Sequence, residues 1–127
     1  IVLGPSNPFL SLAPIIAIPG MQELLRQAAR RVVAVSPIIG GQALKGPAGK
    51  IMSELGLDVS AEGWTRWMNE QYPGLVDVWA WDETDEALAG DLRSEGMDIR
   101  TTQTVMSDPL RAGAFGDWLL GVCNSDH

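Results

Sequence analysis

The sequence predicts an α/β fold, namely a doubly wound, mostly parallel sheet of the Rossmann-like kind. Short apolar runs alternate with amphipathic stretches along the whole chain, as in proteins built from successive β–α units. Some runs are continuously apolar, such as that containing Val32, Val33 and Val35, which indicates strands buried on both faces. Nearly half of the 127 residues are apolar and a fifth are charged, which suits one domain with its own core.

Four strands are expected, at residues 1–3, 31–35, 75–81 and 97–100. In the third of them, Trp79 and Trp81 alternate with Val78 and Ala80. One face of this strand therefore belongs to the core, and the other could cover a neighbouring segment or a second subunit. A homodimer is one arrangement that the sequence leaves open.

Six helices are expected between and after the strands, at residues 11–16, 21–29, 47–55, 60–71, 84–94 and 108–122. Side-chain oxygens can accept hydrogen bonds from the first turn of most of them, and the expected capping residues are Ser11, Ser60, Thr84 and Asp108. Proline suits the first helical position, where no N–H is needed, and this applies to Pro47 and Pro109.

Charge and cysteine content exclude several functions. A net charge of −7 argues against nucleic-acid binding, which needs clustered Lys and Arg. The single cysteine, Cys123, cannot form a disulfide within the chain, so we expect a reducing, cytoplasmic location. Its only candidate partner is the terminal His127, and we interpret Cys123 as a buried thiol; one Cys and one His cannot bind zinc. No apolar stretch reaches the roughly 20 residues of a membrane helix, so no membrane contact is expected.

The chain begins in an apolar run that looks like the second half of a buried strand. We therefore expect residues 1–127 to be a partial domain, the C-terminal portion of one α/β domain.

Two loops at the carboxyl ends of the first two strands are the candidate ligand-binding loops, because ligands of open α/β sheets bind at that edge. In residues 4–8, Gly4 allows a ligand to approach the backbone closely. Pro8 keeps Asn7 out of the helical region, so the Asn7 amide can point outward. The alternative is a plain turn from strand to helix.

The second loop, residues 36–41, is the stronger candidate for binding a phosphate. Gly40 and Gly41 before a helical segment can form a nest of backbone N–H groups for an anion. Lys45 could add a positive charge, and Ser36 a hydroxyl. The spacing matches neither the Walker motif nor the dinucleotide fingerprint, so a phosphate role and a plain turn both stay open.

Acidic residues around the third strand are weaker candidates. Asp77 and Asp82 flank that strand and could be functional. The acidic run over residues 82–91 is most simply a solvated helix face with acids favoured near its N-terminus.

Taken in order, the loop residues resemble the 2-phospho-L-lactate transferases. The resemblance is carried by Gly4-Pro5-Ser6-Asn7-Pro8, Ile18-Pro19-Gly20, Ser36-Pro37-Ile38-Ile39-Gly40-Gly41, Lys45-Gly46-Pro47 and Thr104-Val105-Met106-Ser107-Asp108. It spans nearly the whole chain, and the ordered set is far more specific than either loop alone.

The resemblance implies an enzyme of coenzyme F420 biosynthesis. Such a transferase moves a phospholactyl or phosphoenolpyruvyl group from its guanosine diphosphate conjugate to the terminal hydroxyl of the deazaflavin FO; GMP leaves, and Mg²⁺ assists as cofactor. Direct phosphoryl transfer of this kind depends on positioning and charge neutralisation. The residues that match the family's loops, and that would line the donor's phosphates or nucleoside, are Gly4, Ser6, Asn7, Ser36, Gly40, Gly41 and Lys45.

This sequence departs from the family by lacking its glycine-rich opening loop and the acidic residues expected to hold Mg²⁺ and FO. We therefore assign no catalytic residue and no metal ligand here, and expect the chain alone to be inactive. A sister family that binds nucleotide sugars or dinucleotides carries Gly-Pro-Gly-Ser-Leu-Tyr-Thr-Ser at positions 4–11, and Ser6-Asn7-Pro8 favours the transferases instead. A non-catalytic structural fragment is a third reading, and the acyl group of the donor stays open.

Overall fold

A four-stranded parallel sheet forms the centre of the molecule. The computed structural model describes residues 1–28, 30–43 and 46–124. The strand order is β1-β2-β5-β6, and each neighbouring pair is parallel. These strands are β1 (Val2–Leu3), β2 (Val33–Val35), β5 (Val78–Asp82) and β6 (Ile99–Thr102). The predicted α/β class and mostly parallel sheet are confirmed, with strand bounds shifted by a few residues.

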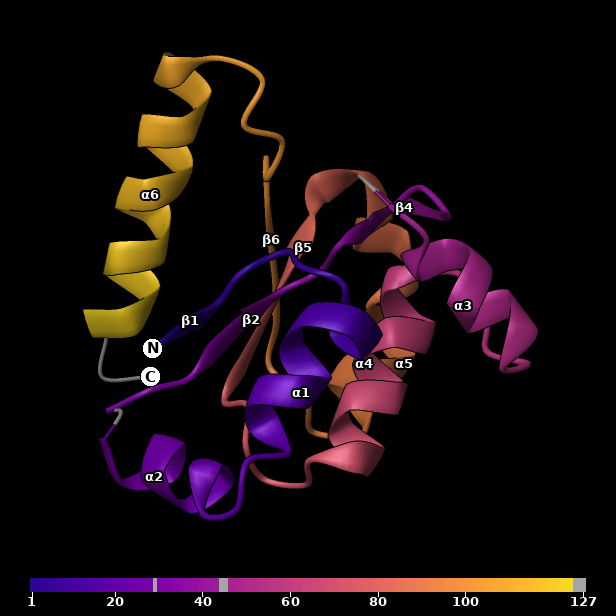
Figure 1. The fold of residues 1–127 in the computed structure, drawn as a ribbon. Coiled ribbons are helices and arrows are strands. Elements are labelled where there is room, and N and C mark those ends of the chain that lie inside the picture. The colour runs from indigo at the N-terminus through magenta and orange to yellow at the C-terminus, as the bar shows by residue number, and fades with distance from the viewer. Residues whose placement is uncertain (29, 44–45, 125–127) are drawn as a thin grey trace.

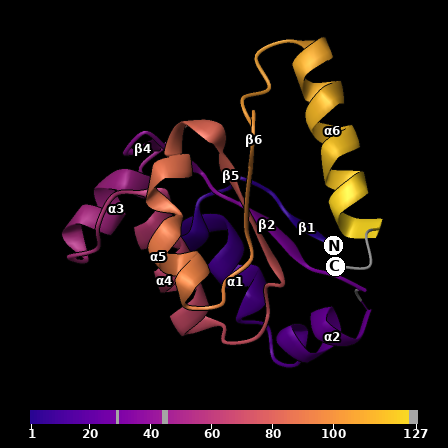
Figure 2. The ribbon, with the colours of Figure 1, turned by 180° about the vertical axis from the view of Figure 1, so that it is seen from behind.

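Helices cover both faces of this sheet. Of the described helices, only α6 (Pro109–Asn124) lies against one face, while α1 (Ala13–Ile16), α4 (Ala61–Gln71) and α5 (Gly90–Ser94) lie on the other (Figures 1 and 2). Helix α2 (Met21–Ala28) lies below the amino ends of the strands in Figure 1. Helix α3 (Ala48–Glu54) follows a two-stranded hairpin made of β3 (Ile38–Ile39) and β4 (Gln42–Ala43).

The two faces of β5 pack into separate apolar clusters. Trp79 and Trp81 join the larger cluster, where the ring of Trp64 meets that of Trp79 edge-on at a centroid distance of 5.4 Å. The indole N–H of Trp81 donates to Thr65 Oγ1 at 3.0 Å, which satisfies the one polar atom of a fully buried side chain. On the other face, the second cluster combines residues of β2, β5 and α6, namely Val33, Val35, Val78, Ala80, Phe115 and Val122. Both faces of β5 are therefore covered within this chain.

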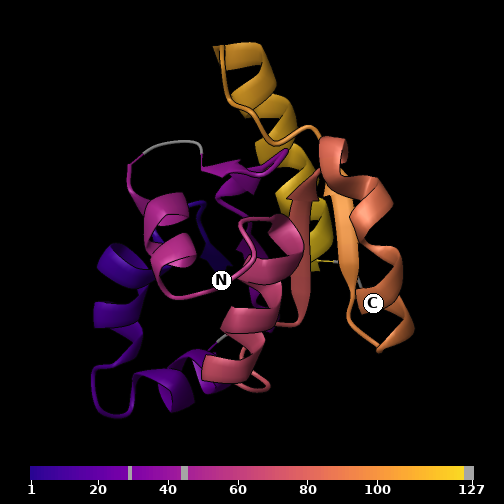
Figure 3. The same ribbon diagram turned by 90° about the vertical axis from the view of Figure 1, so that its right-hand side faces the viewer.

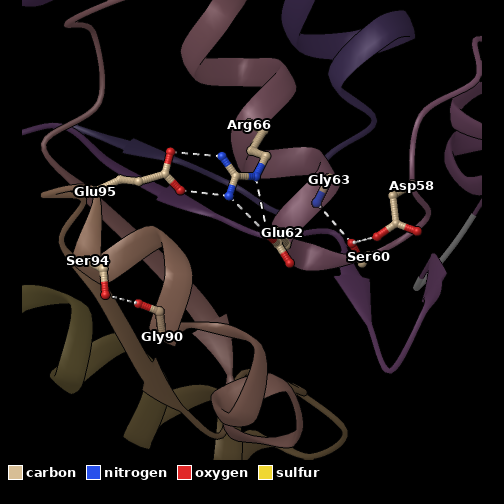
Figure 4. Close-up of polar contacts among 8 residues, drawn as sticks. All are labelled: Asp58, Ser60, Glu62, Gly63, Arg66, Gly90, Ser94 and Glu95. Atoms are coloured by element: carbon tan, nitrogen blue, oxygen red, sulfur yellow. Dashed lines mark hydrogen bonds and ion pairs between the residues drawn. The ribbon is translucent and has the colours of Figure 1, made fainter.

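Ser60 and Asp108 cap their helices as predicted. Ser60 Oγ accepts from the N–H of Gly63 at 2.9 Å and donates to Asp58 Oδ2 at 2.7 Å (Figure 4). A side chain at Gly63 would collide with the Asp58 carbonyl, so glycine is required in this turn. Asp108 Oδ1 accepts from the N–H of Arg111 at 2.8 Å, and Pro109 begins α6.

Helix α4 is tied to α5 by a charged group of three side chains. Figure 4 shows the Arg66 guanidinium between Glu62, one turn earlier on α4, and Glu95, which follows α5. The Arg66–Glu95 contact is bidentate, with N–O distances of 3.0 and 2.7 Å. These side chains are partly exposed, so the group orients the two helices more than it stabilises the fold.

The predicted caps Ser11 and Thr84 are wrong, because an earlier side chain takes each role. Asn7 caps the π-helical turn η1 (Pro8–Leu12), which continues into α1 and starts with proline where an N–H is dispensable. Asp82 caps the 3₁₀ helix η2 (Glu83–Leu88) by accepting from the N–H of Thr84. The single helix expected over 84–94 is therefore two, η2 and α5.

Within the described residues, no single helix is long and apolar enough to cross a membrane. One bent pair, Pro8–Ile16 with Met21–Ala28, meets the length and composition requirement jointly, with an angle of 84° between its parts. Core helices of soluble proteins meet the same requirement.

Candidate functional site

The two candidate loops start side by side at the carboxyl edge of the sheet. β1 and β2 are parallel neighbours, and Leu3 lies opposite Ala34 in their register. The chain leaves β1 into residues 4–8 and leaves β2 into residues 36–43, so both loops begin at the edge where open α/β sheets bind ligands. The same edge carries η2 after β5 and the segment after β6 (Figures 1 and 3).

In the first loop, one polar atom of the Asn7 side chain is engaged and the other has no partner among the described residues. Asn7 Oδ1 accepts from the N–H groups of Phe9 at 2.8 Å and Leu10 at 3.0 Å. Its Nδ2 is buried, and within residues 1–28, 30–43 and 46–124 it meets no hydrogen-bond acceptor. A buried donor without an acceptor is costly, which makes this amide a candidate ligand contact. The expected non-helical backbone is confirmed, with φ −56° and ψ 119°.

Gly4 and Ser6 leave the first loop open. A Cβ at Gly4 would meet no atom within 4 Å, so the backbone there is approachable. Ser6 is exposed, and its N–H donates to the Gly4 carbonyl at 2.7 Å in a tight turn. Both positions are compatible with the predicted approach of a ligand to this loop.

Ser36 lies at the end of β2, but its hydroxyl is committed to the loop itself. The residue is 1% exposed. Ser36 Oγ donates to the carbonyl of Ile38 at 3.0 Å and accepts from the N–H of Ile38 at 3.1 Å. This local ring of hydrogen bonds shapes the turn from β2 into the hairpin, and the hydroxyl is not presented to solvent.

Gly40 and Gly41 form the tip of the β3–β4 hairpin, which was not predicted and lies between β2 and the expected helix, α3. Their φ angles are +59° and +81°, a left-handed pair that a two-residue hairpin turn requires. Both residues are exposed. Two consecutive glycines were therefore a hairpin signal, and the short flanking segments Ile38–Ile39 and Gln42–Ala43 obscured it.

Asp85 contacts the second loop, and its interpretation as part of a solvated acidic helix face over residues 82–91 is wrong. It lies in η2, is 4% exposed, and accepts the Gly40 N–H on both carboxylate oxygens at 3.2 Å. The Gly40 N–H, one of the groups expected to face a phosphate, is thus already used by a carboxylate of the same chain. The spacing of 45 residues between the two partners gave no local signal.

Asp82, a weak candidate from sequence, is a buried carboxylate with four hydrogen bonds. Oδ1 accepts from Thr104 N at 2.9 Å and Thr104 Oγ1 at 3.0 Å. Oδ2 accepts from Thr84 N at 3.0 Å and Thr84 Oγ1 at 2.6 Å. Burial acts to raise the pKa of Asp82, but the hydrogen bonds from both threonines outweigh it and hold the pKa below its usual range.

The other sequence candidates lie apart from this edge or outside the described residues. Asp77 precedes β5 at its amino end and accepts from the N–H of Val32 at 2.7 Å, which is a structural role. Cys123 is half-buried on α6. Lys45 and His127 lie outside the residues that the structure describes.

Asp82 and Asp85, the two buried carboxylates at this edge, are poorly suited to hold magnesium. The described residues contain no group of three or more His, Cys, Asp or Glu side chains that could hold a metal ion. Each Asp82 oxygen already accepts two hydrogen bonds, and Asp85 is turned to Gly40. A magnesium ion needs oxygens that are free to bind it.

Comparison with known proteins identifies the family. The family model described as 2-phospho-L-lactate transferase CofD matches residues 1–110, which include both loops, Asp82 and Asp85. The chain belongs to the CofD family. This confirms the resemblance drawn from the loop residues.

Individual CofD relatives agree with the family model. A 2-phospho-L-lactate transferase of Methanosarcina acetivorans is 38% identical over 122 residues, which are 96% of this chain and 38% of the relative. One of Methanococcoides burtonii is 42% identical over 106 residues, 84% of this chain and 33% of the relative. A phosphoenolpyruvate transferase of Kitasatospora aureofaciens is 35% identical over 109 residues, 85% of this chain and 33% of the relative. The chain thus spans between 33% and 38% of the length of these CofD proteins.

Proposed function

We propose that the protein transfers a phospholactyl or phosphoenolpyruvyl group from its guanosine diphosphate conjugate to FO in the cytoplasm, as a step of coenzyme F420 biosynthesis. Membership of the CofD family carries this proposal. Relatives named 2-phospho-L-lactate transferase and phosphoenolpyruvate transferase both support a phosphoacyl donor, and they leave its acyl group open.

The reaction is one phosphoryl transfer. The terminal hydroxyl oxygen of FO forms a bond to the phosphorus that carries the acyl group and gives up its proton. The bond from this phosphorus to the GMP oxygen breaks, and GMP leaves with the electron pair. Binding groups on the protein align the two oxygens and offset the donor's charge.

The donor is proposed to lie over the two loops at the carboxyl edge. In the first loop, Gly4 and Ser6 leave room for it, and Asn7 Nδ2 is a buried donor that a phosphate or base oxygen would satisfy. In the second, the Gly41 backbone is exposed and open to its phosphates, and Lys45 enters the proposal from the sequence alone, as a positive charge. Ser36 and Gly40 enter the proposal as the framework of that loop, because their polar groups are already bonded.

Magnesium enters the proposal as a cofactor held by residues outside this chain. The buried carboxylates Asp82 and Asp85 are already engaged by hydrogen bonds, and no step above passes through the metal. For the same reason, we expect residues 1–127 alone to show no transfer.

The test is an assay with the full-length protein, meaning the longest natural polypeptide that contains residues 1–127. Incubation with FO, Mg²⁺ and each candidate donor (lactyl, enolpyruvyl or glyceryl) should release GMP and yield a phosphorylated deazaflavin, detected by mass spectrometry. Parallel incubations without FO and with residues 1–127 alone serve as controls. Binding of a UDP-sugar with no turnover of FO would overturn the proposal in favour of a nucleotide-binding regulatory protein.

A further inference from the structure

The 3₁₀ helix η2 forms hydrogen bonds with two segments of the carboxyl edge: the β3–β4 hairpin and the segment that follows β6. Asp82 ends β5 and caps η2, and Asp85 follows one turn later. Each of these aspartates is 4% exposed. A buried carboxylate persists only where donors surround it, so their partners show what each one holds.

Asp82 fixes the segment that follows β6. Its Oδ1 takes both the backbone N–H and the hydroxyl of Thr104, 22 residues away. Its Oδ2 takes the equivalent pair of groups from Thr84 at the start of η2. One carboxylate therefore joins the beginning of η2 to the segment around Thr104, which carries part of the family resemblance.

Asp85 fixes the hairpin on the other side. The Gly40 N–H points at both oxygens of a carboxylate buried under an exposed turn. The hairpin strands are only two residues each, so the internal β3–β4 ladder does little to set where the turn lies. The contact with Asp85 fixes the position of the Gly40–Gly41 turn relative to the carboxyl edge of the sheet.

Helix η2 is itself anchored to the sheet. Arg93 Nη1 contacts Glu86 Oε1 at 2.7 Å, and Arg93 Nε and Nη2 donate to the carbonyl of Ile99 in β6 at 3.1 and 2.9 Å. Helix η2 is thus held between α5 and β6. The hairpin bonded to Asp85 and the Thr104 segment bonded to Asp82 are therefore positioned relative to these two elements.

Chemical participation by these aspartates fits the structure less well. Asp82 accepts four hydrogen bonds and its lowered pKa keeps it ionised at neutral pH, which suits neither a general acid nor a base that must take up a proton. Asp85 faces a backbone N–H of its own chain, so a bound phosphate would lie on the far, exposed side of the turn.

We propose that Asp82 and Asp85 are positioning residues of the transferase site. Asp85 fixes the position of the Gly40–Gly41 turn, and Asp82 fixes that of the segment around Thr104. Helix η2 thereby holds the hairpin and the Thr104 segment at a fixed separation. This inference rests on the proposed function, because it assumes that the turn faces the donor's phosphates.

The test compares Asp85→Ala and Asp85→Asn with Glu83→Gln, an exposed acid on the same 3₁₀ helix, all in the full-length protein. Loss of a charged acceptor for Gly40 should raise the donor KM and the GDP dissociation constant about tenfold in Asp85→Ala, with kcat changed much less. In Asp85→Asn, the amide oxygen of the new side chain would still accept from Gly40, so this variant should lose only about threefold. Glu83→Gln should stay within about twofold of the wild type.

Hydrogen exchange of residues 38–43, measured without ligand, supplies the independent readout. Asp85→Ala should speed exchange at Gly40, and Asp85→Asn should restore most of the protection; thermal melts identify any variant that is unfolded. If the wild type is active and a folded Asp85→Ala protein has the same donor KM, this inference is overturned and the proposed function stands. An inactive wild type would instead overturn the proposed function.

Discussion

The loop after β1 and the loop after β2 leave the same sheet edge but are held in different ways. Residues 4–8 are organised locally: Asn7 Oδ1 accepts from the N–H groups of Phe9 and Leu10, two and three residues later in the chain. Residues 36–43 are organised locally by Ser36 and at long range by Asp85. Among the described residues, the local loop retains a buried donor, Asn7 Nδ2, that meets no acceptor, whereas Ser36 Oγ and the Gly40 N–H in the other loop are bonded within the chain. The comparison shows that a loop held by neighbours in sequence can keep an unused polar group, and that a loop held at long range has its position set by the rest of the fold.

Asp82→Ala should have the largest expected effect, because it removes the long-range hydrogen bonds between Asp82 and Thr104. It removes an acceptor from four donors and leaves the buried Thr104 without its partner. The free energy of unfolding should fall by about 3 kcal/mol, since each buried group left unsatisfied costs about 1–3 kcal/mol. Urea unfolding of the full-length protein measures this, with Glu83→Ala as the exposed control. A loss no larger than the control's would show that Thr104 finds another partner.

Acid should weaken the same contact, by less than the alanine substitution does. The pKa of Asp82 is lower in the folded state than in the unfolded chain, whose value is about 3.9. Its contribution is therefore complete above about pH 4 and is lost as the pH falls through the lower, folded pKa. The difference in unfolding free energy between wild type and Asp82→Ala should be constant from about pH 5 to 7 and shrink near pH 3. A difference independent of pH would assign the stabilisation to packing.

Lys45→Ala tests whether the hairpin side holds the donor's phosphate. An acidic protein offers little background attraction for a polyphosphate, so a local ammonium should matter. GDP binding should weaken about tenfold, the value of one charge-assisted hydrogen bond. Calorimetric titration measures this beside thermal melts, with Lys50→Ala as the control, because the Lys50 side chain is 78% exposed and contacts only Glu54 on its own helix, at 3.9 Å, among the described ion pairs. If a folded Lys45→Ala protein binds GDP as tightly as the wild type does, Lys45 is not a phosphate contact, and the loop after β1 becomes the better candidate.

Asn7 allows the two roles of the local loop to be separated, with the smallest expected effects. Asn7→Ala should lower the free energy of unfolding by about 1 kcal/mol through loss of the cap. Asn7→Asp keeps an acceptor at the start of η1 and should preserve stability. Both variants lose the Nδ2 donor, so both should weaken GDP binding by about threefold. If Asn7→Asp binds GDP as tightly as the wild type does, the buried amide is only part of the cap.

Patterns within about a dozen residues predicted the fold well. The continuous apolar strands, the Ser60 and Asp108 caps and the order of β–α units all depend on neighbours in sequence, and the structure confirms them. The predicted caps at Ser11 and Thr84 failed for a local reason, because each helical segment begins earlier than predicted: Asn7 accepts from the N–H groups of Phe9 and Leu10, and Asp82 accepts from that of Thr84.

The site was less accessible to sequence reasoning because its decisive contacts are not local. The residues quoted for the two loops do lie at one sheet edge, as their places after β1 and β2 predicted. Nothing near Gly40 indicated that its N–H would meet Asp85, and nothing near Asp82 indicated Thr104. The position of Ser36 at a strand end predicts a hydroxyl available to a ligand, but the structure shows that this hydroxyl is hydrogen-bonded to the backbone of Ile38.

The separation of 45 positions in sequence between Gly40 and Asp85 also affects the order of assembly. The glycine turn leaves the ribosome long before η2 does, and β2 must wait equally long for β5, its central partner in the sheet. Contacts so far apart in sequence form late, because the closure entropy of the intervening chain must be overcome first. A nascent chain that ends before Asp85 therefore contains the glycines of the turn but not the carboxylate that holds Gly40 in the folded protein.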